Sequence, residues 1–360
     1  FTHAISTAPV CAPARTTIIT GMYASSLGAQ HMRSQVRTPS WLRLFPEYLR
    51  EAGYYCTNNS KTDYNVEHDL KLVWDENSRR AHYRERREDQ PFFAVFNHTG
   101  THESKIRAKD RKTAHDKTKA PVPPYHPDIP AVRNNWAQYY DNLTTMDKWF
   151  ADHLQALEEA GLAEDTIVFF WADHGPGMPR SKRWAGWSGV HIPLIVHIPE
   201  KWKHLRPPDY EPGGKSTRLV GFVDFGATML ALAGIEPAPF HQGHAFLGKN
   251  LGKPPEYSFV FRGRMDERPD CSRSVIDGRY IYIRNYMPHL PHGQWLNYQM
   301  KTQTTQTWYR LFQEGKLNKV QAAFWQARAP EELYDLAKDP HETRNLAGST
   351  DHATKLRELR

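Results

Sequence analysis

The segment Thr166-Ile-Val-Phe-Phe-Trp-Ala-Asp-His-Gly175 has the pattern of a buried strand that opens into a polar turn. From about 133 to 160, just before it, apolar residues recur close to the helical period of 3.6, and Gly161 ends that helix. The run 91–96 is apolar on both faces and predicts a second strand, in a sheet covered on both sides. We therefore predict an α/β fold with a mainly parallel sheet sandwiched by helices. Other expected elements are a helix ending at Gly53 and then a strand within 41–57, a strand at 193–198 and a helix at 223–234.

The character of the sequence changes after about residue 254. Residues 257–261 and 274–286 have the pattern of strands, with Asp277-Gly278 as a tight hairpin turn. A helix is expected near 351–360. We predict a catalytic α/β domain over 1–254, lacking its first strand, and a smaller antiparallel subdomain with a helix over 255–360. The charged and Pro-rich segment 103–130 is interpreted as a solvated excursion.

The composition narrows the class of partner. The formal charge of +7 indicates attraction to polyanions, which include nucleic acid, acidic membranes and sulfated or phosphorylated substrates. No zinc-finger spacing, RNP-like aromatic string or heptad-bearing basic helix supports nucleic acid, and no apolar run approaches the ~20 residues of a membrane span. Three cysteines, Cys11, Cys56 and Cys271, do not describe a disulfide scaffold.

Near the N-terminus, Cys11-Ala-Pro-Ala-Arg15 is followed by Thr20-Gly21. Pro13 suits a first helical turn and Gly21 can end the helix, so Cys11 should face free backbone N–H groups. A helix start attracts anions, and the Arg15 guanidinium adds a planar fork for anion oxygens. The alternative interpretation is a buried structural cysteine.

This Cys-x-Pro-x-Arg…Thr-Gly pattern is similar to the signature of the type I, formylglycine-dependent sulfatases of the alkaline phosphatase superfamily, although Ala14 stands where Ser is usual. The resemblance implies that a formylglycine-generating enzyme converts Cys11 to formylglycine, the nucleophile, and that calcium is the metal. It also implies an upstream Asp-Asp pair, which would precede Phe1. We therefore expect an internal start, a missing first strand and a periplasmic or secreted location.

The same resemblance assigns further residues. Asp173 and His174 match a metal-binding pair at a strand end, although Asp and Gly are also common in plain turns. Lys182 matches a sulfate-binding lysine, with Arg183 as the alternative register. Lys61 matches a catalytic lysine, but Ser60 replaces the usual Gly and Asp63 stands where a His is expected. Asp63, His31 or a water could take that role.

His98 and His102 have a spacing that a helix could use for zinc, but the intervening Thr-Gly-Thr disfavours a helix. The resemblance implies that His102 contacts the ester oxygen and is the general acid, a role that suits imidazole. The alternative is a His bonded to a loop carbonyl. The terminal segments Glu332–Leu336 and Asn345-Leu-Ala347 also match the family, so the resemblance extends over residues 8–347.

These features predict a sulfuric ester hydrolase that acts on a sulfated carbohydrate. The alternatives are a phosphonate or phosphate ester hydrolase of the same superfamily and a non-catalytic binder of sulfated glycans. Five residues of the smaller subdomain could read sugar carboxylates or neighbouring sulfates, although an ordinary surface charge is the commoner interpretation for any one of them: Arg262, Arg264, Arg268, His289 and His292.

Overall fold

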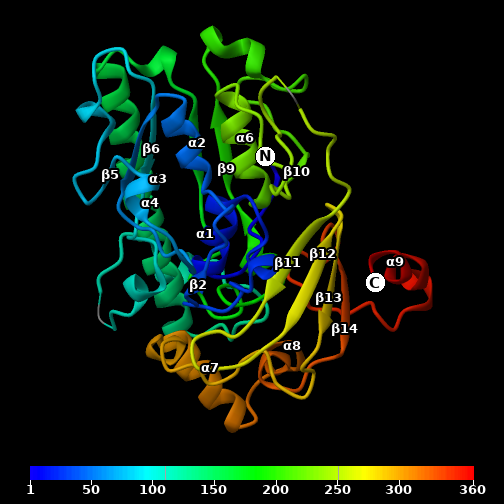
Figure 1. The fold of residues 1–360 in the computed structure, drawn as a ribbon. Helices are drawn as coiled ribbons and strands as arrows, with labels where there is room; N and C mark the ends of the chain where they lie inside the picture. Colours follow the sequence, from blue (N-terminus) through cyan, green and yellow to red (C-terminus); the bar gives the residue numbers. More distant parts are fainter. Residues whose placement is uncertain (110, 250) are drawn as a thin grey trace. The chain divides into compact units, whose positions relative to one another are not determined.

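The computed structural model describes residues 1–109, 111–249 and 251–360 (Figure 1). The chain forms two compact units, each built from separate stretches of sequence. Unit 1 comprises Phe1–Asn97, Glu164–Asp173 and Ile192–Ser258, and unit 2 comprises His98–Ala163, His174–His191 and Phe259–Arg360. The division at residue 254 stays a prediction about which parts fold as domains.

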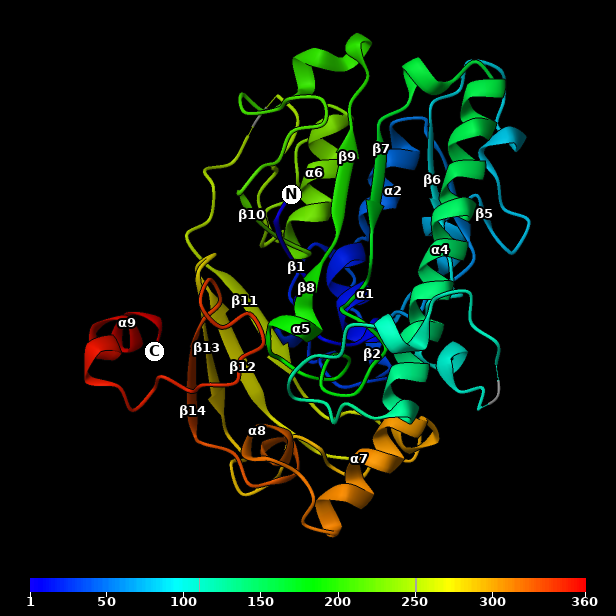
Figure 2. The ribbon, with the colours of Figure 1, turned by 180° about the vertical axis from the view of Figure 1, so that it is seen from behind.

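Unit 1 holds short strands that pair mostly in parallel, as predicted. β3 (Tyr55–Asn59) lies between β5 (Glu76–Asn77) and β6 (Phe92–Phe96), with both pairings parallel. β1 (His3–Ile5) pairs in parallel with β10 (Leu219–Gly221). By contrast, β7 (Val168–Trp171) lies antiparallel to β9 (Leu194–His197), as Figure 2 shows. The remaining strands are β2 (Val36–Arg37), parallel to β4 (Val66–Glu67), and β8 (His191–Ile192).

The helices of unit 1 begin and end where local chemistry allows. α1 (Cys11–Thr20) ends because Gly21 adopts a left-handed φ of 65° and its N–H bonds the Thr17 carbonyl. α2 (Phe45–Glu51) starts where the Glu47 carboxylate accepts the Leu44 N–H at 2.6 Å. The predicted stop at Gly21 is confirmed, and α2 ends at Glu51, two residues before the predicted stop at Gly53. The other α-helices of the unit are α3 (Leu70–Val73) and α6 (Val223–Leu232), and its 3₁₀ turns are η1 (Ala24–Leu27), η2 (Tyr83–Glu85), η5 (Ala163–Asp165) and η6 (Glu200–Leu205).

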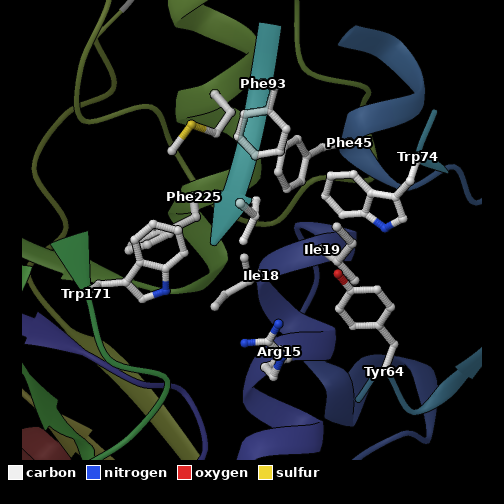
Figure 3. A pocket seen from close by; sticks show the side chains of 11 residues that line it. Arg15, Ile18, Ile19, Phe45, Tyr64, Trp74, Phe93, Trp171 and Phe225 are labelled. Carbon is white, nitrogen blue, oxygen red and sulfur yellow. The ribbon is translucent and has the colours of Figure 1, made fainter. Parts of the chain in front are cut away.

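The prediction of strands buried on both faces is wrong for β6 and β7, because every residue of both strands is only half-buried. Beside these strands lies an apolar pocket, whose lining includes Phe93 of β6 and Trp171 of β7 (Figure 3). Its other walls come from the helices α1, α2 and α6 and the loops near them. The lining residues are Arg15, Ile18, Ile19, Phe45, Tyr64, Trp74, Phe93, Val95, Trp171, Phe225 and Met229.

Unit 2 is organised around α4 (Pro130–Glu159), the helix that the apolar periodicity predicted from about 133 to 160. It starts about three residues earlier than predicted, with Pro130 in its first turn. Segment 103–130 is not simply a solvated excursion. Ile106 and Ala120 from it are buried against Val132 and Trp136 of α4, within a shared hydrophobic cluster. The apolar residues scattered in that charged stretch therefore anchor it. Its 3₁₀ turns are η3 (Glu103–Ile106) and η4 (Lys117–Lys119).

The C-terminal part of unit 2 is the predicted antiparallel sheet, in the order β11-β12-β13-β14. At the hairpin between β12 and β13, Gly278 has a φ of 91° and the Asp277 carboxylate accepts the Tyr280 N–H. The strands are β11 (Ser258–Arg262), β12 (Ser272–Ile276), β13 (Tyr280–Asn285) and β14 (Glu331–Asp335). The helices are α5 (Trp187–Val190), α7 (Gln303–Gln313), α8 (Lys319–Ala322) and α9 (Ala353–Leu359), with 3₁₀ turns η7 (Gln299–Lys301), η8 (Ala323–Trp325) and η9 (Thr350–His352).

Among the described residues, no helix combines the length and the hydropathy that crossing a bilayer requires.

Candidate active site

Cys11 is the first residue of α1 and is buried, with 3% of its surface exposed. The preceding Val10 has extended backbone, and its carbonyl accepts the Ala14 N–H at 3.3 Å. The N–H groups of the first turn point along the helix axis, and the aligned peptide dipoles make this end partially positive. The predicted placement of the thiol at a helix start is thus found in the structure.

Arg15, one turn further along α1, holds the loop that follows β3. Its Nε donates to the Thr62 carbonyl at 2.8 Å, and its Nη2 donates to the Lys61 carbonyl and, at 2.9 Å, to Asn97 Oδ1. These three hydrogen bonds of the guanidinium are therefore all made to groups of the protein. In this structure Arg15 positions the segment that carries Lys61.

Asn97, at the end of β6, is a site residue that the motif comparison missed. It donates to Asn58 Oδ1 at 2.9 Å and to the Asn59 carbonyl at 3.0 Å, while it accepts from Arg15. Asn58 is fully buried and donates to the Lys61 carbonyl. The signal available in the sequence was the cluster of polar residues after each apolar strand, because neighbouring parallel strands end at one edge of their sheet.

Lys61 and Asp173 form an ion pair in unit 1, with Nζ 3.2 Å from Oδ2. The ammonium also lies 3.8 Å from Asp63 Oδ2. Burial alone would lower the pKa of Lys61, but the charges of Asp173, Cys11 and Asp63 outweigh burial and raise it. Lys61 is therefore a firmly charged cation beside the thiol, and Asp63 is placed close to it.

Asp173 also lies near Cys11, with the thiol sulfur and a carboxylate oxygen within 4.8 Å of one another. The Ser6 hydroxyl donates to the Asp173 carbonyl at 2.8 Å and fixes the strand end. His174 is the next residue in the chain but belongs to unit 2, where its Nδ1 bonds the Gly175 carbonyl at 2.7 Å. A carboxylate and a group derived from Cys11 suit a cation, although calcium takes about six to eight oxygen ligands.

In unit 2, the predicted residues His102 and Lys182 are brought together. Lys182 is 3% exposed, and its Nζ lies 3.2 Å from His102 Nε2. The other ring nitrogen, Nδ1, shares a 2.9 Å bond with the Ser104 hydroxyl. His98 lies instead against Trp149, and no cluster of three metal-ligating side chains among the described residues includes it.

Glu103 is the second residue that the sequence comparison missed. Its carboxylate is 2.8 Å from Lys182 Nζ and receives two bonds of 2.9 Å from the Arg183 guanidinium. Arg183 also donates to Asp266 at 3.0 Å. Lys182 and Arg183 were the two alternatives for the sulfate-binding cation. Lys182 lies beside His102, whereas the Arg183 guanidinium is paired with Glu103 and Asp266.

The five expected substrate contacts have different surroundings. Arg262 is buried, and its Nη2 pairs with Asp270 Oδ2 at 3.0 Å, so it is no surface charge. His292 is only 11% exposed, its Nε2 lies 3.1 Å from a Glu332 oxygen, and burial lowers its pKa to about 3. His292 thus belongs to a buried network, which argues against a contact with sugar. Arg264 and Arg268 each donate to a backbone carbonyl, and His289 is exposed.

Comparison with known proteins decides the family. Residues 56–235, half of the chain, match the family model described as Sulfatase. The chain is 38% identical, over an alignment of 409 positions, to an ulvan-active sulfatase of Formosa agariphila, covering 100% of this chain and 67% of that protein. It belongs to the sulfatase family. The predicted membership and fold class are thereby confirmed.

Solved structures agree with this fold. The sulfatase chain superimposes on a 2-O GAG sulfatase with a TM-score of 0.68 at 18% identity, covering 99% of this chain and 81% of that one. It also superimposes on a phosphonate monoester hydrolase from Silicibacter pomeroyi, with a TM-score of 0.67 at 17% identity, covering 99% and 86%. At these identities the likeness concerns the fold alone, which sulfate and phosphonate ester hydrolases share.

Proposed function

We propose that this sulfatase removes sulfate from a sulfated carbohydrate, with a nucleophile formed from Cys11. The observation that carries the proposal is the arrangement in unit 1. There, a thiol at a helix start lies within 4.8 Å of the Asp173 carboxylate, which in turn pairs with Lys61 at 3.2 Å. An ulvan-active relative at 38% identity supports a sulfated polysaccharide as the class of substrate.

The chain's own residues would supply binding and charge. The N–H groups at the start of α1 and the Lys61 ammonium would stabilise negative charge on the sulfate, and Arg15 would keep the Lys61 loop in place. Lys182 would bind a sulfate oxygen. His102 would pass a proton from Nε2, the nitrogen that faces Lys182, to the departing sugar oxygen.

Two further groups, a modified side chain at position 11 and a metal ion, would complete the site. Formylglycine, made from Cys11 by a formylglycine-generating enzyme, would supply an activated oxygen as nucleophile toward sulfur. Asp173, and with it His174, would hold a calcium ion, whose charge polarises the sulfate. A periplasmic or secreted location follows from the same family resemblance. Arg264, Arg268 and His289 remain proposed contacts to the sugar.

The test combines chemistry at Cys11 with substrate choice. Protein coexpressed with a formylglycine-generating enzyme is checked by intact mass for conversion, loaded with calcium, and assayed on matched aryl sulfate and aryl phosphate esters and on sulfated oligosaccharides. We expect sulfate hydrolysis that C11A reduces by at least about a thousandfold, as for other catalytic nucleophiles, while C271S retains activity. Faster phosphate than sulfate hydrolysis would favour the phosphatase alternative. Glycan binding by converted protein without any hydrolysis would favour the binder.

A further inference from the structure

Glu103 is a buried carboxylate with two cationic partners in unit 2. Only 2% of its side chain is exposed, and its partners Lys182 and Arg183 belong to the same unit. Oε1 lies 2.8 Å from Lys182 Nζ and 2.9 Å from Arg183 Nη2, while Oε2 accepts from Arg183 Nη1 at 2.9 Å. The carboxylate is therefore bidentate toward Arg183 and shares one oxygen with Lys182.

This carboxylate stays ionised. Burial by itself would raise the pKa of Glu103, but the charges and hydrogen bonds of Arg183 and Lys182 hold it well below the ordinary value of 4.5. A buried charge is stable only when it is paired and hydrogen-bonded, and removing one partner leaves the others uncompensated. Glu103, Lys182 and Arg183 thus act as one electrostatic group, and Asp266 pairs with Arg183 from outside this group.

The backbone around Glu103 is equally constrained. A Cβ at Gly177 would lie 2.8 Å from both the Cα and the N of Glu103, so only glycine lets the two segments approach this closely. The Lys182 N–H donates to the Pro176 carbonyl at 3.1 Å, which closes the turn between Gly177 and Lys182. The turn that carries Lys182 is therefore packed against the residue that follows His102.

The geometry of Lys182 shows what the pairing achieves. Its ammonium directs one N–H to Glu103, and its Nζ lies 3.2 Å from His102 Nε2, the nitrogen that carries its own proton when His102 acts as the acid. An ammonium carries a further N–H donor, which remains for an oxygen of the substrate. Without Glu103, a flexible four-carbon stem would hold the charge in no single position, since lysine presents a point charge with several rotamers.

We propose that Glu103 is a positioning residue of the sulfatase reaction, which fixes the Lys182 ammonium beside His102 while Arg183 locks the carboxylate. This inference rests on the proposed function, because it assumes that Lys182 binds the sulfate group and that His102 protonates the leaving oxygen. Glu103 itself touches neither substrate nor nucleophile in this assignment.

The test uses E103Q, which keeps the shape and removes the charge, with D266N as the matched control. D266N breaks the Arg183–Asp266 pair of 3.0 Å and leaves the Lys182–Glu103 contact intact. On a sulfated oligosaccharide we expect E103Q to lower kcat/KM about tenfold to a hundredfold, and D266N to change it less than about threefold. Thermal unfolding of both variants reports the structural contribution.

Leaving-group dependence separates positioning from mere stability. A good leaving group such as p-nitrophenolate needs no proton, so E103Q should lose kcat on the oligosaccharide by several times more than on p-nitrophenyl sulfate. Equal losses on both substrates, in proportion to a fall in Tm shared with D266N, would overturn the proposal. If E103Q does not fold, E103D takes its place. This variant keeps the negative charge but moves it away from Lys182 by one methylene. It should also lose more kcat on the oligosaccharide than on p-nitrophenyl sulfate.

Binding of inorganic sulfate, measured by calorimetry on the full chain, distinguishes this inference from the proposed function. Absence of turnover by converted wild-type protein defeats the proposed function, whereas sulfate binding still reports on Lys182. Loss of a negative charge would by itself tighten binding of an anion, so a dissociation constant at least about threefold weaker in E103Q supports positioning. Unchanged or tighter binding in E103Q contradicts it.

Discussion

The ammonium of Lys61 lies 3.2 Å from the carboxylate of Asp173, although the two residues are 112 positions apart in the chain. The pair joins the loop after β3 to the segment after β7. It explains why the pKa of Lys61 is raised despite burial, because Asp173 is the strongest of the charges that favour the ammonium. In this structure, the Lys61 ammonium therefore balances the negative charge of Asp173, the proposed metal ligand.

Replacement of Lys61 by methionine should reduce turnover of sulfate esters. K61M removes the cation next to Cys11 and Asp173, and loss of one such electrostatic contact typically lowers kcat/KM by about a hundredfold. Steady-state kinetics on an aryl sulfate measure the effect. K71M, at an exposed lysine on α3, is the control and should leave activity unchanged. Activity of K61M within about twofold of wild type would exclude a role for Lys61 in binding sulfate.

Replacement of Asp173 by asparagine should weaken cation binding. D173N keeps the shape of the side chain but removes the negative charge near the position of Cys11. We expect the dissociation constant for calcium, measured by calorimetry, to rise by at least about tenfold, because hard cations favour carboxylate oxygen. EDTA should abolish the activity of wild-type protein, and calcium should restore it. D89N, which alters an exposed carboxylate, serves as control, and equal calcium affinity in D173N and D89N would contradict the assignment.

Gly21 should tolerate alanine less well than Gly28 does. Both have left-handed backbone, with φ of 65° and 72°, so alanine at either costs about 1–2 kcal/mol. At Gly21 a Cβ would also lie 2.0 Å from His241 Cδ2, whereas nothing lies within 4 Å of a Cβ at Gly28. Urea unfolding should therefore show a larger loss of free energy for G21A than for G28A. Equal losses in the two variants would mean that His241 moves away at little cost and would contradict this prediction.

Acid should remove the stabilisation that Glu103 provides. Its pKa in the folded state is lowered from 4.5, since Arg183 and Lys182 outweigh burial, so its contribution is present above about pH 4.5 and is lost as the pH falls. The difference in unfolding free energy between wild type and E103Q should be largest near neutral pH and shrink toward pH 3. Urea titrations at several pH values measure it. E88Q, at an exposed glutamate, should show little difference at any pH.

Much of the fold could be predicted because it depends on local patterns. The 3.6-residue period of α4, the glycine after α1 and the Asp277-Gly278 turn each act within a few residues, and each was found in place. The half-buried state of β6 and β7 could not be predicted in this way. Apolar composition on both faces of a strand indicates capacity for burial, whereas actual burial depends on which elements lie beside the strand.

The sequence predicted which residues form the candidate site, but it did not predict the contacts between them. Cys11, Lys61, His102, Asp173 and Lys182 were named from motifs, and their assigned roles stay proposals. Motifs did not reveal that Arg15 holds the Lys61 loop, that Asn97 joins the strand ends, or that Glu103 pairs with Lys182. Glu103 was hidden because charged residues in a polar stretch are usually solvated.

By itself, the sequence determined the order of strands and helices, the thiol at a helix start and the membership of the sulfatase family, since each is written in neighbouring residues or in an ordered set of motifs. Only the tertiary structure decided which charges meet. Lys61 pairs with Asp173 across 112 positions, and Lys182 meets His102 across 80, because folding, and not spacing along the chain, brings buried charges to the partners that stabilise them.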